Sequence, residues 1–164
     1  MKIRILLMLS AMVLCVFALT ACKETQMTAD TLLTQINAVC AQDSVDAPAL
    51  QEQKENERFY ALNGSIQLIL STDAQTGGLS GVTLRGDLTQ RENFDRDAFA
   101  YHALNLIDLV DPSASITDIN QIYQKLGIET YTEAQSETLL FHAISYKFEV
   151  DDSTAVFSAV RSIE

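Results

Sequence analysis

Three segments of the chain carry apolar residues at the spacing of an amphipathic helix, and this pattern predicts three helices. The first runs from Thr28 to about Ala41, the second from about Asp95 to Val110, and the third follows Ser115. Their apolar positions are Leu32, Leu33, Ile36, Val39 and Cys40; Phe99, Ala103, Leu106, Ile107 and Val110; and Ile119, Ile122, Tyr123 and Leu126.

The ends of the second and third helices carry recognisable signals. Asp111–Pro112 ends the second helix, because the residue before a proline is pushed out of helical geometry. Ser115 followed by Asp118 resembles a capping box, and Gly127 is a typical stop. Both helices therefore have predicted boundaries as well as predicted faces.

A hairpin is the clearest strand signal, in the stretch ERFYALNGSIQLILS. Asn63–Gly64 suits a two-residue type I′ turn, because both residue types tolerate a positive φ. Such a turn pairs Ala61 with Ile66 and Phe59 with Leu68, and places all four on one face. The opposite face then carries Arg58, Tyr60 and Gln67.

Further strands follow from alternation of apolar and polar residues. Residues 79–87 predict a third strand with Val82 and Leu84 on one face. The C-terminal part predicts one long strand with an apolar face of Leu140, His142, Ile144, Tyr146, Phe148 and Val150. After a turn at residues 150–154, a return strand places on that same face Ala155, Phe157 and Ala159.

The order of these elements predicts an α+β fold, with an antiparallel sheet of about five to six strands and about three helices on one face. The sheet consists of a β-meander and a C-terminal hairpin. The polar stretch 43–57, which holds Pro48, is predicted to be an exposed loop. Two helix-then-hairpin halves suggest a duplication, but they share no sequence motif, so we do not predict a repeat.

The N-terminus has the three parts of a secretory signal. Lys2 and Arg4 form a basic start, residues 5–19 are almost wholly apolar, and small residues lead to Cys22. An uncleaved membrane anchor is the alternative, since the apolar run approaches the length of a span. Both interpretations leave the basic start in the cytoplasm and export the remainder.

The end of this segment resembles the lipobox of bacterial lipoproteins, with Leu19, Thr20, Ala21 and Cys22 in its four positions. The resemblance implies cleavage before Cys22 and attachment of acyl chains to its sulfur, which anchors the protein to the membrane. The expected organisation is a signal peptide over residues 1–21, a lipidated tether over 22–27 and a single domain over 28–164. Lys23 is similar to the outer-membrane sorting pattern, so the location is the cell membrane or the outer membrane, with the domain facing the periplasm or the cell exterior.

Cleavage makes the chain more acidic than its full sequence. Removing Lys2 and Arg4 with the signal leaves 9 Lys and Arg against 22 Asp and Glu, so the net charge falls from −11 to −13. This charge argues against nucleic-acid binding, which needs a basic surface. It equally opposes adsorption of the domain on anionic lipid.

The remaining residues with potential chemistry are few. Cys40 has no cysteine left to pair with, and its place on an apolar helix face predicts a buried, inert thiol. His102 has neither Glu nor His one helical turn away. His142, on an apolar strand face, is most simply a core or edge residue, with a buried general base as the alternative.

Residues 111–115, DPSAS, match the D-x-S-x-S pattern by which von Willebrand A domains hold a divalent cation. The preceding segment has a helical period and too few residues follow for such a fold. We therefore interpret these residues as a helix–helix connection in which Ser115 is a cap. The acidic residues at 43–57 and 151–152 are interpreted as solvated surface, with weak Ca²⁺ binding as the alternative.

These observations predict no catalytic residue, no metal and no cofactor. The expected function is that of an anchored accessory module that binds an envelope protein. The alternatives are a small-ligand or metal-binding lipoprotein and, third, an envelope hydrolase that uses His142 or His102.

Overall fold

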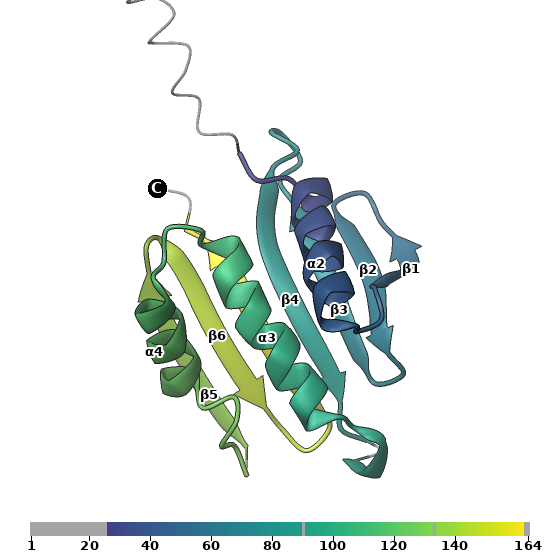
Figure 1. Ribbon diagram of the computed structural model, residues 1–164, viewed down its shortest axis with the longest axis vertical. Coiled ribbons are helices and arrows are strands. Elements are labelled where there is room, and N and C mark those ends of the chain that lie inside the picture. The colour runs from purple at the N-terminus through teal and green to yellow at the C-terminus, as the bar shows by residue number, and fades with distance from the viewer. Residues whose placement is uncertain (1–25, 90, 133, 163–164) are drawn as a thin grey trace, which may run out of the picture.

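The computed structural model describes residues 26–89, 91–132 and 134–162, and these form one seven-stranded antiparallel sheet with helices on one side (Figure 1). The strands lie in the order β1-β2-β3-β4-β7-β6-β5. The helices are α2 (Ala29–Asp43), α3 (Arg96–Val110) and α4 (Ile116–Leu126), with a 3₁₀ turn, η1 (Arg91–Asn93). The strands are β1 (Ala49–Gln53), β2 (Glu57–Asn63), β3 (Ile66–Thr72), β4 (Leu79–Asp87), β5 (Gln135–Phe141), β6 (Ile144–Val150) and β7 (Thr154–Arg161).

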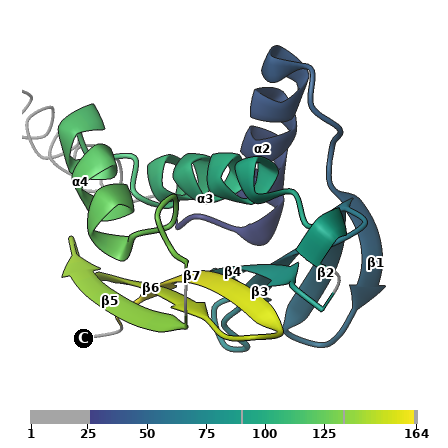
Figure 2. The ribbon, with the colours of Figure 1, turned by 90° about the horizontal axis from the view of Figure 1, so that it is seen from below.

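The predicted α+β class and the one-sided placement of the helices are confirmed. Figure 2 shows α2, α3 and α4 on the same side of the curved sheet. Helix α2 contacts β3, α3 contacts the central strands β4 and β7, and α4 contacts β5 and β6. The strand number is slightly above the predicted five to six.

The predicted helix boundaries and buried faces are largely confirmed. Ser115 and Asp118 form a complete capping box at the start of α4, and Gly127 ends that helix with a φ of 67°. Thr28 and Asp95 cap α2 and α3 by accepting hydrogen bonds from backbone N–H groups three residues later. Each cap of this kind stabilises a helix by about 1 kcal/mol.

The core is formed where α3 crosses the middle of the sheet. Phe99 from α3 is fully buried against Phe148, with 6.1 Å between ring centroids. The inward face of β7 carries the predicted Ala155, Phe157 and Ala159, all buried. Burying a large apolar side chain contributes about 1.5–3 kcal/mol, so this layer is the main source of stability.

The predicted register of the β2–β3 hairpin is wrong by one residue. Ala61 pairs with Gln67 and Asn63 pairs with Ile66, and a bulge lies between these two pairs. Tyr60 therefore faces the core at 4 % exposure, whereas the sequence pattern had placed it outside. The physical reason is that the Asn63 side chain forms the turn, so no type I′ geometry is needed: its Oδ1 accepts from the backbone N–H groups of Ser65 and Ile66.

The predicted long C-terminal strand is two strands, β5 and β6, joined by a tight turn at His142–Ala143. Phe141 and Ile144 pair directly across it. The two turn residues have φ values of 46° and 60°, so the type I′ conformation occurs here and not at Asn63–Gly64. His142 is consequently not on the apolar face of a strand.

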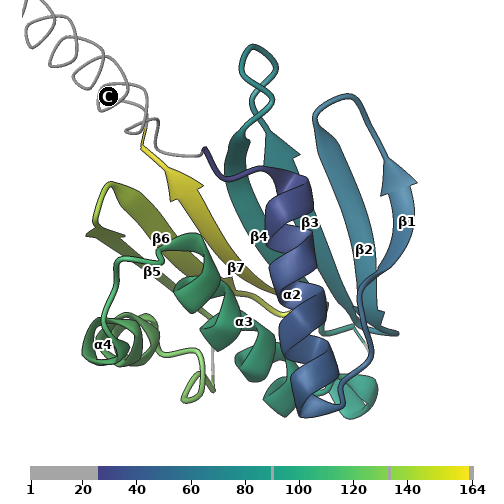
Figure 3. The same cartoon turned by 45° about the horizontal axis from the view of Figure 1, so that its top comes forward.

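The stretch 43–57 is also not a simple loop, because it contains the edge strand β1. All five residues of β1 are exposed, which explains why no apolar alternation marks the strand in the sequence. With β1 included, the chain has two halves of similar order, in which a helical part is followed by an antiparallel meander. Figure 3 shows the two halves side by side, and they join where β4 pairs with β7.

Candidate functional site

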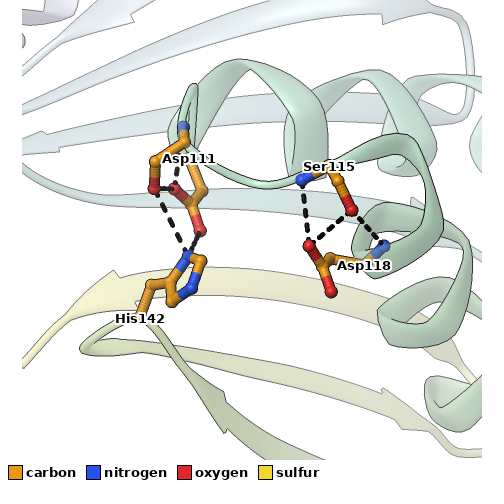
Figure 4. Close-up of polar contacts among 5 residues, drawn as sticks. Asp111, Ser115, Asp118 and His142 are labelled. Carbon is orange, nitrogen blue, oxygen red and sulfur yellow. Dashed lines mark hydrogen bonds and ion pairs between the residues drawn. The ribbon is translucent and has the colours of Figure 1, made fainter.

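A cluster of polar contacts joins the end of α3 to the tip of the β5–β6 hairpin. Asp111 is the C-cap residue of α3 and is 4 % exposed. Its Oδ2 lies 2.8 Å from Nδ1 of His142, whose side chain is 47 % exposed. In Figure 4 the His142 imidazole, at the tip of the β5–β6 hairpin, points toward the Asp111 carboxylate at the end of α3. A buried carboxylate needs such partners, because burying an unpaired charge is costly.

The hairpin presents His142 in an unusual backbone conformation. Positive φ values are unfavourable for residues with a Cβ, and neither His142 nor Ala143 is a glycine. Two contacts hold the turn: the N–H of Ser162 donates to the carbonyl of Ala143 at 2.8 Å, and the Phe141 ring lies 4.0 Å from the imidazole. Residues held in such a conformation frequently mark functional sites, and they persist only where their surroundings fix them.

Ser113 completes the cluster, but it does not form a catalytic triad. Its hydroxyl donates to Oδ1 of Asp111 at 2.5 Å and lies 3.3 Å from the same His142 nitrogen, Nδ1, that contacts Asp111. In a triad the serine hydroxyl meets the other ring nitrogen. The Ser113 hydroxyl is therefore a second partner of the carboxylate and is not activated by the imidazole.

The remaining nitrogen of His142, Nε2, makes no hydrogen bond to the described residues. An imidazole held at Nδ1 by a carboxylate can use a free Nε2 to accept a proton or to bind a hydrogen-bond donor. This is the one histidine–carboxylate ion pair among the described residues.

The D-x-S-x-S segment does not converge on one point. Asp111 contacts His142, whereas Ser115 bonds to Asp118 at the start of α4 (Figure 4). Bonds from Ser115, with a further contribution from His142, lower the pKa of Asp118. The described residues contain no group of three or more His, Cys, Asp or Glu side chains suited to a metal. The interpretation of these residues as a capped helix–helix connection is confirmed.

Tyr146 lies within the core of the same half of the sheet. Its side chain is fully buried, and its hydroxyl has no hydrogen-bond partner among the described residues. Burial and the negative charge of Asp111 both raise the pKa of the phenol, so it stays protonated. No sequence signal singles out this tyrosine, because its position in an alternating strand predicts only burial.

His102 and Cys40 lie apart from this cluster, in a narrow apolar crevice between α2 and α3. Cys40 is 1 % exposed, and its burial raises the pKa of the thiol, as expected of an inert cysteine. Burial likewise lowers the pKa of His102. The crevice has a volume of about 10 Å³, close to the minimum for one water molecule. It is too small to hold an organic ligand.

The second candidate site is the face of the sheet that no described helix covers. On the three central strands this face consists of Gln67, Ile69, Ser71, Gly81, Thr83, Arg85, Asp87, Thr154, Val156, Ser158 and Val160. Its charged members are Arg85 and Asp87, both near one end. In a domain this acidic, such a charge-poor strip is distinctive, since depletion of charge marks the centres of protein interfaces.

The lipobox residues Leu19, Thr20, Ala21 and Cys22 lie outside the described residues. Within the described part of the chain, no helix combines the length and apolar character needed to cross a membrane.

Comparison with known proteins gives no relative from which a function could be transferred: no family model, no curated protein and no solved structure matches the chain.

Proposed function

We propose that this chain is an exported, lipid-anchored envelope protein whose folded domain binds a protein partner and has no catalytic role. The basic start, the apolar run and the lipobox ending at Cys22 support export and anchoring. Two or more acyl chains hold a protein stably at a membrane. The domain then starts only a few residues after the anchor, which keeps it close to other envelope proteins.

The uncovered sheet face is the observation that carries the binding role. Thr83 and Ser158 pair directly across β4 and β7 at its centre, and neither is charged. Ile69, Val156 and Val160 add apolar area around them. The centre of this face therefore carries small, uncharged side chains, which lose little solvation when a partner covers them. Charged residues border it, with Arg85 and Asp87 at one end and the Lys147–Glu149 ion pair of β6 beside Ser158 and Val156.

Crosslinking in intact cells tests this proposal. A photoreactive amino acid replaces Thr83 or Ser158, and the matched control carries it at Gln124, an exposed position of α4 on the opposite side of the sheet. We expect both sheet-face positions to capture the same protein and the α4 position not to capture it. Failure to recover a specific protein, or equal capture from all three positions, would contradict the proposal.

A second candidate function, an envelope hydrolase, is favoured by one observation, the Asp111–His142 hydrogen bond of 2.8 Å. His142 would use its free Nε2 to remove a proton from water. A chromogenic acetate ester tests this, since a true general base gives turnover that His142→Gln abolishes. The binding proposal predicts no turnover above buffer, and it predicts that His142→Gln captures the partner as well as the parent protein does.

A further inference from the structure

The two edges of the sheet differ in how well they are protected against pairing with another strand. Strand β1 is five residues long, follows Pro48, and has an irregular register between Leu50 and Glu52. Short length, proline and bulges are the usual features that block an edge. Strand β5 has seven residues, pairs with β6 without interruption, and contains no proline, lysine or arginine.

The outward-pointing backbone groups of β5 can be assigned from the hairpin. A two-residue turn is flanked by a hydrogen-bonded pair, here Phe141 and Ile144, and the pairs then alternate along an antiparallel ladder. Leu139 therefore bonds to β6, whereas Ser136, Thr138 and Leu140 direct their N–H and C=O groups outward. No described strand pairs with this edge, since β5 is the last strand in the sheet order.

The side chains along this edge indicate what would pair with it. Leu140 is 66 % exposed and lies on the same uncovered face as Val160, two strands away, so it adds apolar area at the edge. Ser136 and Thr138 are small and leave the backbone accessible. The strand's charged residue is Glu137, which is exposed, in a domain with a net charge of −13 after cleavage.

We propose that β5 accepts an extended, basic segment of a protein partner as an eighth strand of the sheet. Backbone hydrogen bonds to Ser136, Thr138 and Leu140 provide the affinity, and an apolar side chain beside Leu140 with lysine or arginine near Glu137 provides selectivity. A second copy of this chain is a poorer occupant, because each copy carries the same strong negative charge. The proposal rests on the proposed function in that the occupant is a protein.

The test uses the full chain in detergent micelles and a seven-residue peptide of alternating valine and lysine, with blocked ends. We expect the peptide to slow hydrogen exchange at the amides of Ser136, Thr138 and Leu140. Thr138→Pro removes one outward N–H and leaves the bonds to β6 intact, so it should weaken binding about tenfold. Thr138→Val is the matched control and should bind as the parent does.

A second variant keeps the test informative if Thr138→Pro fails to fold. Leu140→Lys repels the basic peptide and removes the apolar contact, so it should also weaken binding about tenfold, as should replacing the peptide's lysines by glutamate. Absence of peptide binding, or binding that leaves the three amides unprotected, would overturn the proposal. So would protection that appears without peptide as protein concentration rises, because the occupant would then be a second copy. Capture from Thr83 and Ser158 is a separate readout, so the binding function can stand if this edge contact fails.

Discussion

Asp111 and His142 lie 31 residues apart in the chain and form a 2.8 Å hydrogen bond that joins the end of α3 to the tip of the β5–β6 hairpin. The same carboxylate accepts from Ser113, so a buried negative charge is satisfied from two elements. The contact explains how a hairpin turn without glycine or asparagine is kept in place. It also leaves one imidazole nitrogen directed away from the carboxylate.

Removing the imidazole should destabilise the domain. His142→Ala leaves the buried Asp111 carboxylate short of one partner, and we expect a loss of about 1–3 kcal/mol in the free energy of unfolding. Urea unfolding measures this loss. In a double-mutant cycle with Asp111→Ala, the stability loss of the double variant should differ from the sum of the two single losses by at least about 0.5 kcal/mol. Additive losses would show that the two side chains do not interact in solution.

The turn itself should be improved by glycine. Ala143 has a φ of 60°, which costs a residue with a Cβ about 1–2 kcal/mol. Glycine removes that cost but gains freedom in the unfolded state, so Ala143→Gly should stabilise the domain by about 0.5–1 kcal/mol. Ala74→Gly, at an exposed turn position without a positive φ, is the control and should be neutral or destabilising. A loss of stability in Ala143→Gly would contradict the turn geometry.

The parts of the fold that could be predicted are those fixed by local signals. The buried stripe of α3, the capping box of Ser115 and Asp118, and the inward face of β7 each depend on residues a few positions apart. Spacing within one element carries that information directly. The α+β class follows from the order of such elements.

The parts that could not be predicted depend on contacts between distant segments. The residue types His142 and Ala143 do not favour a type I′ turn, so the alternation from Leu140 to Val150 looked like one strand. The Asp111–His142 contact becomes visible only when β5 and β6 are separate strands whose connecting turn lies beside the end of α3. Strand β1 has no buried residue, so apolar periodicity could not mark it.

The β2–β3 turn provides a direct test of the corrected register. Neither Asn63 nor Gly64 has a positive φ, and a Cβ on Gly64 would meet nothing within 4 Å. Gly64→Ala should therefore be neutral or stabilise by up to about 0.5 kcal/mol. Asn63→Ala removes the Oδ1 that accepts from Ser65 and Ile66, and should cost about 1 kcal/mol. If chemical denaturation shows that Gly64→Ala is less stable than Asn63→Ala, the result would support the type I′ turn and contradict the corrected register.

Lipid attachment is tested at the anchor residue. Cys22→Ala should release the protein from the membrane fraction, because in the proposed lipoprotein the acyl chains are attached to the Cys22 sulfur. Cell fractionation with labelled palmitate measures both location and acylation. Cys40→Ala is the matched control, since a buried thiol receives no lipid, and should stay membrane-bound and labelled. Retention and labelling of Cys22→Ala would contradict the lipoprotein assignment.

His102 should make stability depend on pH in mildly acidic solution. Burial lowers its pKa below the ordinary 6.5, so the unfolded chain takes up a proton before the folded domain does. Above pH 6.5 this group does not change the stability. Below pH 6.5 the free energy of unfolding decreases as the pH falls, by at most about 1.4 kcal/mol per pH unit for this one group. Urea unfolding from about pH 7.5 to about pH 5.5 measures the change.

The comparison that isolates His102 uses His102→Gln, which cannot titrate. This variant should lose less stability than the parent protein over that pH interval, whatever its stability at neutral pH. His142 is present in both proteins, so it contributes equally to both measurements. Tyr101→Phe removes the hydroxyl that bonds Asp43 at 2.6 Å but keeps His102, and should retain the full pH dependence. An equal acid-induced loss in His102→Gln and the parent would show that the protonation of His102 does not differ between the folded and unfolded states.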